Sequence, residues 1–296
     1  MSQEKNKETW PNFFIVGAAR AGTTSLYTYL KNTPGVYMSE HKEPHYFVDN
    51  MKTGAYDESK YLQLFKKVKN EKAIGEASTG YLIDPSSAKC IHDKIPDAKI
   101  IILLRDPVER AFSSYLTYAT RTKKDLSSHE IFLETFGTKF GLKYDKNPYL
   151  GRGLYSSQVK KYLKIFGEEN VGIWFFEDMK KDTMQVVKEV LKFLKIDSLP
   201  PDNVSKTYNP YLVFRGKITE FLCLNKTIRK IAPIFLPSLA LRHLVFNKLF
   251  IKEGQKPKLS ESDRRKLENY YYDDVTALEK ALKRKIPWEW VKYDNV

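Results

Sequence analysis

Short runs of consecutive apolar residues alternate along the chain with longer segments in which apolar residues recur every three or four positions. The runs are centred near residues 14, 37, 74, 101 and 173, and the run at 99–104 is apolar after its first lysine. Continuous apolar runs are typical of parallel strands covered on both faces, whereas the wider spacing is typical of helices. The pattern predicts one α/β domain, with a central, mostly parallel sheet flanked by helices.

We expect a polar tail over residues 1–11 and the domain over 12–296. Residues 122–150 are polar and rich in lysine, which predicts an insertion or lid. Residues 215–258 contain ten lysines or arginines and two acidic residues, so this region adds +8 to the net charge. Two interpretations of the basic region remain open: a helix that packs on the sheet with a solvated face, or a surface that attracts an anionic partner.

The composition narrows the class of protein. The 50 basic and 36 acidic residues give a formal net charge of +14, which favours a polyanionic ligand, an anionic membrane surface or nucleic acid. Two cysteines are too few for a disulfide framework or a cysteine zinc site, and they favour a reducing compartment. The first residues do not resemble a signal peptide, and prolines and charges interrupt the longest apolar stretch. We therefore expect a cytoplasmic protein, with peripheral contact at the inner membrane face as a further option.

The first candidate site lies within residues 13–26, where an apolar run enters a glycine turn and continues into a hydroxyl-rich helix start. Gly17 and Gly22 would let backbone N–H groups approach a phosphate, and a helix N-terminus favours an anion. The spacing is that of a nucleotide P-loop, except that Thr23 stands where the lysine would be. The only cation in the turn is Arg20, so we expect a phosphate clamp for something other than a magnesium triphosphate. The alternative is an ordinary strand-to-helix turn with incidental glycines.

The second candidate site is the loop after the short apolar run near residue 37. It contains Glu43 and His45 among other charged residues, around a proline that cannot sit inside a helix. Titratable groups that emerge from a strand beside a phosphate site are candidates for acid–base chemistry, although a solvated surface loop is the alternative. Glu76 follows another strand-like run, and from spacing alone either carboxylate could act as the base.

The third candidate site begins where the strongest predicted strand ends in Arg105. Pro107 is well placed to open a helix that carries Ser113 along one face. Ligands of open α/β sheets bind beyond the carboxyl ends of the strands, so this arginine and this serine could bind one phosphate together. Alternatively, Arg105 forms an ion pair with Asp106 or Glu109.

Four segments resemble the sulfotransferases that use 3′-phosphoadenosine 5′-phosphosulfate as donor. Arg20–Leu26 (RAGTTSL) resembles their 5′-phosphosulfate loop, with arginine in place of the commoner lysine, and Arg105–Tyr115 resembles their 3′-phosphate segment. Glu43–Phe47 (EPHYF) looks like the segment that supplies the general base in heparan sulfate N- and O-sulfotransferases. Glu76–Leu82 is similar to an acceptor-side segment of the same enzymes, although Ala77 replaces its lysine.

The resemblance implies a sulfotransferase that moves a sulfuryl group from this donor to a hydroxyl or amine, releases adenosine 3′,5′-bisphosphate and requires no metal. It implies catalytic roles for Glu43 as the base, Arg20 as a stabilising cation and His45 as an assisting group. The residues that it implies in nucleotide binding are Arg20, Ala21, Gly22, Thr23, Thr24, Ser25, Arg105, Ser113 and Tyr155. Core packing would explain Tyr155 equally well.

The implied acceptor is a glycan, a glycolipid or another hydroxyl or amine compound, and not nucleic acid. Two other classes of protein remain open. A P-loop kinase would bind a magnesium triphosphate, and the missing lysine and missing Walker B carboxylate argue against it. A non-catalytic polyanion-binding module would use the positive charge without a nucleotide.

Overall fold

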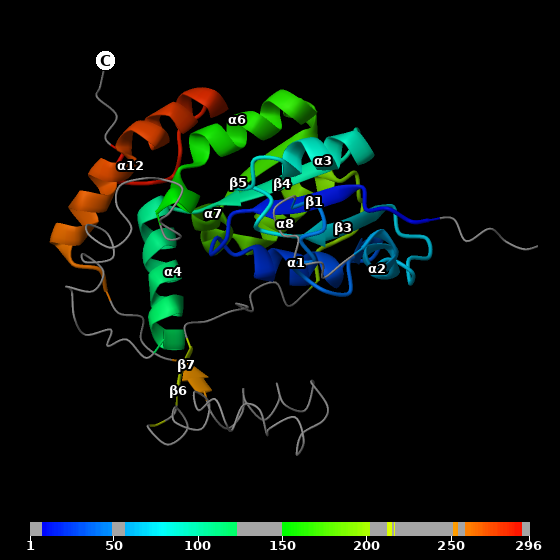
Figure 1. The fold of residues 1–296 in the computed structure, drawn as a ribbon, viewed down its shortest axis with the longest axis horizontal. Coiled ribbons are helices and arrows are strands. Elements are labelled where there is room, and N and C mark those ends of the chain that lie inside the picture. The colour runs from blue at the N-terminus through cyan, green and yellow to red at the C-terminus, as the bar shows by residue number, and fades with distance from the viewer. Residues whose placement is uncertain are drawn as a thin grey trace, which may run out of the picture.

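The structure, a computed structural model, describes residues 8–48, 57–122, 150–201, 212–214, 216, 251–253 and 258–291. Five strands form one parallel sheet in the order β2-β3-β1-β4-β5 (Figure 1). They are β1 (Phe13–Gly17), β2 (Val36–Met38), β3 (Ala73–Ala77), β4 (Lys99–Leu104) and β5 (Val171–Phe175). All five lie where apolar runs predict strands, so the expected α/β class with a parallel sheet is confirmed.

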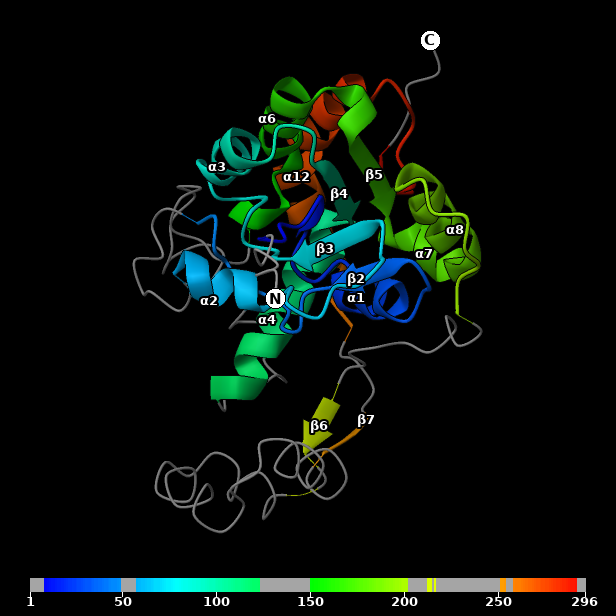
Figure 2. The same cartoon turned by 90° about the vertical axis from the view of Figure 1, so that its right-hand side faces the viewer.

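Helices cover both faces of the sheet (Figure 2). On one face lie α3 (Ser87–Lys94) and α6 (Tyr155–Phe166), with α12 (Glu261–Leu282) packed against α6, and on the other lie α1 (Thr23–Lys31) and α8 (Thr183–Phe193). The remaining helical elements are α2 (Glu58–Gln63), α4 (Pro107–Thr122), α7 (Phe176–Lys181) and the 3₁₀ turns η2 (Gly151–Gly153) and η3 (Glu168–Asn170). Helix α4 starts directly after β4, and α12 packs against α4. Both the N-terminal and the C-terminal half of the chain therefore contribute residues near the carboxyl edge of the sheet.

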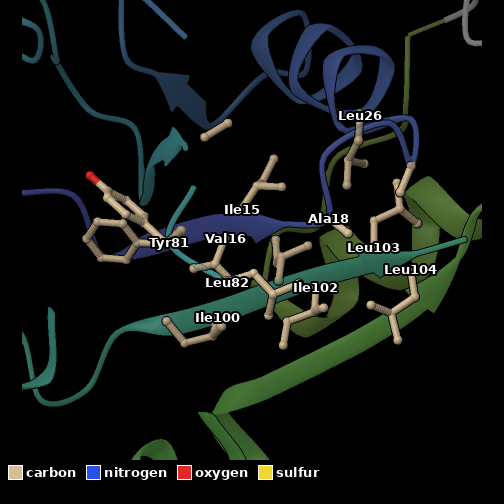
Figure 3. Close-up of a cluster of buried hydrophobic side chains, with 14 of the residues drawn as sticks. Ile15, Val16, Ala18, Leu26, Tyr81, Leu82, Ile100, Ile102, Leu103 and Leu104 are labelled. Atoms are coloured by element: carbon tan, nitrogen blue, oxygen red, sulfur yellow. The ribbon is translucent and has the colours of Figure 1, made fainter. Parts of the chain in front are cut away.

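The two central strands, β1 and β4, form the middle of the hydrophobic core. Residues 13–16 and 100–104 have no exposed surface. Figure 3 shows side chains of both strands, among them Ile15, Val16 and Ile102, close to Leu26 of α1 and to Tyr81 and Leu82 from the segment after β3. A strand with helices on both sides needs apolar residues facing both ways, which is why these runs are continuous rather than alternating.

Tyr61, Leu62, Leu64, Phe65 and Val68 have the spacing of one face of an amphipathic helix, but helix α2 is shorter than this pattern predicts. It ends at Gln63 and is followed by turns. The carbonyl of Leu64 accepts hydrogen bonds from the Tyr37 hydroxyl at 2.9 Å and from the Glu40 amide at 3.4 Å. These partners from the neighbouring segment take a carbonyl that a longer helix would use internally, so tertiary contacts end the helix early.

The predicted insertion at 122–150 and the basic region at 215–258 lie almost entirely outside the described residues. Near and within the basic region, the structure describes β6 (Leu212–Phe214) and β7 (Ile251–Glu253), which pair antiparallel. Among the helices within the described ranges, none is long and apolar enough to cross a membrane.

Candidate active site

The loop between β1 and α1 requires glycine at its last position. Gly22 has a φ of 88°, in the left-handed region, and forms the N-terminal cap of α1. A Cβ added there would lie 2.6 Å from Met179 Cε and 2.8 Å from Phe176 Cδ2, so another residue would have to displace these side chains in addition to adopting the positive φ. The loop therefore delivers the first turn of α1, with its hydroxyl side chains at 23–25, to the carboxyl edge of the sheet. Such a turn presents backbone N–H groups to an anion.

Arg20 joins this loop to the start of α4. Its Nε donates a hydrogen bond to Ser113 Oγ at 3.2 Å, and its carbonyl accepts one from Arg105 Nη1 at 3.1 Å. The sequence places Arg20 and Arg105 in two separate candidate sites, 85 residues apart. The structure brings both sites into direct contact at the carboxyl ends of β1 and β4.

The turn between β4 and α4 is fixed from several directions. The carbonyl of Arg105 accepts a hydrogen bond from the Tyr155 hydroxyl at 2.9 Å, and the Asp106 amide donates to Glu177 Oε1 at 3.1 Å. Trp290 Nε1 donates to Asp106 Oδ2, also at 3.1 Å. Tyr155 is completely buried, so it acts on this site by holding the Arg105 backbone. These surroundings agree with core packing, the other role that the sequence leaves open for Tyr155.

Glu43 follows β2, on the opposite side of β1 from β4 in the sheet order. The segment that follows β3 holds its side chain. Its carboxylate accepts hydrogen bonds from the Thr79 amide at 2.8 Å and from Thr79 Oγ1 at 3.0 Å. Lys42 forms an ion pair with the same carboxylate, and His45 Nε2 lies 3.2 Å from Oε2. The His45 amide in turn donates to Ser78 Oγ at 3.0 Å. Glu43 is therefore fixed by two loops and remains partly exposed.

His45 occupies a space that depends on a glycine. A Cβ added to Gly80 would lie 3.0 Å from both Cε1 and Nδ1 of the imidazole. Burial lowers the pKa of His45, the Glu43 carboxylate opposes this effect, and the charges of Lys42 and Arg152 lower it further. The ring is therefore neutral near pH 7, and in that state its Nε2 can carry a proton directed at Glu43.

Glu76, the other carboxylate considered for the base, is fully buried at the end of β3. The Tyr61 hydroxyl donates a hydrogen bond to it. Burial raises the pKa of Glu76 to about 7, and the hydroxyl hydrogen bonds only partly offset this. An acceptor cannot reach this carboxylate without unpacking the core, so the geometry favours Glu43 for proton abstraction.

Three contributors to the site were not identified from the sequence. Thr79 and Gly80 lie inside Glu76–Leu82, which resembles an acceptor-side segment. The sequence therefore indicates the segment but not these two residues. Arg152 in η2 carried no local signal. Its charge acts on both Glu43 and His45, although it forms no hydrogen bond or ion pair with the described residues.

The described part of the chain contains no cluster of side chains suited to binding a metal ion. No group of three or more histidine, cysteine, aspartate or glutamate side chains there could hold a metal ion. The site is instead a set of cations, backbone amides and hydroxyls, which is the donor set suited to phosphate and sulfate groups.

The sulfotransferase domain family matches residues 11–214. This range includes β1 to β5 and every residue of the site described above except Trp290. The chain belongs to this family. A crystal structure of a sulfotransferase from Alicyclobacillus acidocaldarius aligns with a TM-score of 0.65 at 30% identity, covering 96% of this chain and 100% of that one. The predicted family is therefore confirmed by sequence and by fold.

Curated relatives extend the comparison to larger proteins. The Drosophila melanogaster bifunctional heparan sulfate N-deacetylase/N-sulfotransferase is 24% identical, over 99% of this chain and 28% of its own length. The mouse carbohydrate sulfotransferase 15 is 26% identical, over 64% of this chain and 44% of its own length. The chain thus spans less than half the length of these relatives.

Proposed function

We propose that the chain transfers a sulfuryl group from 3′-phosphoadenosine 5′-phosphosulfate to a hydroxyl or amine of a carbohydrate acceptor. The observation that carries this proposal is the contact of Arg20 with both Ser113 and the Arg105 guanidinium. A nucleotide with phosphate groups at both its 5′ and 3′ positions fits two adjoining phosphate sites. A triphosphate nucleotide would use only the glycine loop, and that loop has Thr23 in place of the P-loop lysine.

In this proposal the donor site is divided between two segments. The loop residues Arg20 and Ala21, together with Gly22 and the first turn of α1 (Thr23, Thr24 and Ser25), bind the 5′-phosphosulfate. Arg105 and Ser113 bind the 3′-phosphate, and Tyr155 fixes the Arg105 backbone. The left-handed conformation of Gly22, with a φ of 88°, supports this loop geometry, because other residues adopt it only with strain.

Glu43 removes the proton from the acceptor, whose oxygen or nitrogen then forms a bond to sulfur as the bond from sulfur to the phosphate oxygen breaks. The donor supplies the activated sulfuryl group. Arg20 and the amides of the first turn of α1 stabilise the negative charge that develops on the departing phosphate. His45 keeps the Glu43 carboxylate oriented from 3.2 Å away, and the Thr79 amide fixes the same oxygen with a hydrogen bond.

A glycan acceptor is supported by the names of the relatives and by the charges around Glu43. Lys42 pairs with the carboxylate, and the Arg152 guanidinium is close enough to lower the pKa of His45. These cations would attract an acceptor that carries its own negative charge, as acidic glycans do. Comparing a neutral glycan with its carboxylated counterpart in transfer assays tests this part, and equal KM values would contradict it.

The nucleotide assignment is tested by thermal unfolding with adenosine 3′,5′-bisphosphate, ADP and magnesium ATP at equal concentrations. At about 100 times its dissociation constant, a nucleotide that binds only the folded state adds roughly 2.7 kcal/mol of stability. We expect the bisphosphate to raise the melting temperature most. An equal or larger response to magnesium ATP would favour a kinase, and a response to polyanions alone would favour a binding module.

A further inference from the structure

A carboxylate lies inside the proposed 3′-phosphate site. Glu109 and Ser113 are four residues apart on α4, so they lie on one side of its first turns, and Arg105 lies in the connection just before the helix. Glu109 Oε2 is 3.5 Å from Arg105 Nη2, and the two side chains are only 30% and 16% exposed. A phosphate bound between Arg105 and Ser113 would therefore lie next to this negative charge.

The other oxygen of the Glu109 carboxylate faces a second arginine. Arg264, near the start of α12, forms a hydrogen-bonded ion pair with Glu109 Oε1. Arg264 also lies 3.7 Å from the Glu268 carboxylate on its own helix. Glu109 thus bridges an arginine of the donor site and an arginine that is 155 residues away along the chain.

The Arg105 guanidinium does not depend on Glu109 for its position. Its Nη1 is bound to the Arg20 carbonyl, and its plane lies over the Phe176 ring with a distance of 4.8 Å to the centroid. Only Nη2 faces the carboxylate. Arg105 can therefore exchange Glu109 for a phosphate oxygen at Nη2 without moving, provided that the charge of Glu109 is neutralised in another way.

We propose that Glu109 is an internal anion that competes with the nucleotide 3′-phosphate for Arg105, and that Arg264 is the positioning residue that holds Glu109 and neutralises it when nucleotide binds. The inference rests on the proposed function, in which Arg105 and Ser113 bind the 3′-phosphate. Its consequence concerns the product. When adenosine 3′,5′-bisphosphate begins to leave, Glu109 takes its place on Arg105, and this exchange speeds release.

The test measures the affinity of adenosine 3′,5′-bisphosphate and of AMP, which lacks the 3′-phosphate, by titration calorimetry. We expect Arg264→Ala to bind the bisphosphate about fivefold more weakly, the upper range for a partly exposed ion pair, and to bind AMP with less than about twofold change. Arg264→Lys keeps the charge and should stay within about twofold of the wild type for both ligands. Arg265→Ala is the matched control, because Arg265 is 73% exposed and pairs with Glu261 away from the site.

Glu109→Gln supplies the second half of the test. We expect it to bind the bisphosphate about threefold more tightly and to release it more slowly in stopped-flow measurements, because the competing charge is gone. Adding Arg264→Ala to this variant should cause no further loss, since nothing remains to be neutralised.

Two results would overturn the inference alone. One is an equal loss of bisphosphate and AMP affinity in Arg264→Ala, which would mean that Arg264 only supports the fold. The other is a loss that persists in the Glu109→Gln background, which would mean that Arg264 contacts the phosphate itself. Equal wild-type affinity for the bisphosphate and AMP would overturn the proposed function, and the inference with it.

Discussion

Both carboxylate oxygens of Glu43 face Thr79, with the Thr79 amide 2.8 Å from Oε2 and Thr79 Oγ1 3.0 Å from Oε1. Glu43 has a φ of 64°, a left-handed conformation that costs a non-glycine residue about 1–2 kcal/mol. The hydrogen bonds from the segment after β3 offset that strain. The position of this carboxylate is therefore set by tertiary structure and not by its own loop, as is common where strain persists at functional sites.

Replacing Glu43 by glutamine tests its role as the base. We expect Glu43→Gln to lower kcat by about 10²–10⁴-fold, because an amide keeps the shape but cannot accept the proton. Affinity for adenosine 3′,5′-bisphosphate should be nearly unchanged. Glu40→Gln is the control, since Glu40 lies in the same loop and pairs with Lys67. Near-normal turnover by a folded Glu43→Gln protein would assign the base to another residue.

Replacing Arg105 by lysine separates charge from geometry in the nucleotide site. Arg105 directs one nitrogen at the Arg20 carbonyl and another at its anionic partner, and a single ammonium cannot reproduce this fork. We expect Arg105→Lys to weaken adenosine 3′,5′-bisphosphate binding about tenfold, by calorimetry, and AMP binding by less. If the variant binds the bisphosphate as tightly as the wild type, the fork is not what reads the 3′-phosphate.

The buried Glu76 should make stability depend on pH. Its pKa is about 7 in the folded protein, above its ordinary value, so the folded state holds the proton more strongly than the unfolded state does. The stability that this provides is complete below the ordinary pKa and is lost as pH rises towards 7, by about 3 kcal/mol at most. Glu76→Gln should remove this fall in urea unfolding measured between pH 5 and pH 8.

The control for Glu76 is Glu58→Gln, which makes the same change at a half-exposed position on α2. We expect this variant to keep the wild-type pH dependence. Parallel curves for the wild type and Glu76→Gln would show that another group produces the fall.

Gly22 and Gly35 form a matched pair for testing the glycine loop. Both have a positive φ, 88° and 81°, but a Cβ at residue 35 would meet no atom closer than 3.8 Å. Gly35→Ala should therefore cost only the backbone strain, about 1–2 kcal/mol in denaturant unfolding. Gly22→Ala adds the clash with Met179 and Phe176, for a further loss of roughly 1–3 kcal/mol. Equal losses in the two variants would contradict this account.

The fold could be predicted from the sequence because its interior strands β1 and β4 are buried on both faces. That burial produces continuous apolar runs, and all five runs became strands. The phosphate loop was equally visible, since its glycines and hydroxyl residues are adjacent in the chain. In each case the residues that determine the local structure are close together in the chain, so their pattern can be recognised in one sequence.

The connections between candidate segments could not be predicted in the same way. The hydrogen bond from Arg20 to Ser113 spans 93 residues and the bond from Tyr155 to Arg105 spans 50, and neither produces a local pattern. Arg105 was expected either to bind phosphate or to pair with Asp106 or Glu109. In the structure it faces Glu109, at 3.5 Å, and this contact was one of the alternatives left open.

The Asp106 turn depends on residues that are made long after it. Trp290 lies 184 residues beyond Asp106, and Trp288 Nε1 donates to Glu177 Oε2 at 3.2 Å beside the same turn. A nascent chain that has left the ribosome as far as the end of α4 already contains the glycine loop, Arg105 and Ser113. It still lacks the two indole donors and α12. Nucleotide affinity should therefore appear only when translation has passed residue 290, so the donor site matures well after its own binding residues have been synthesised.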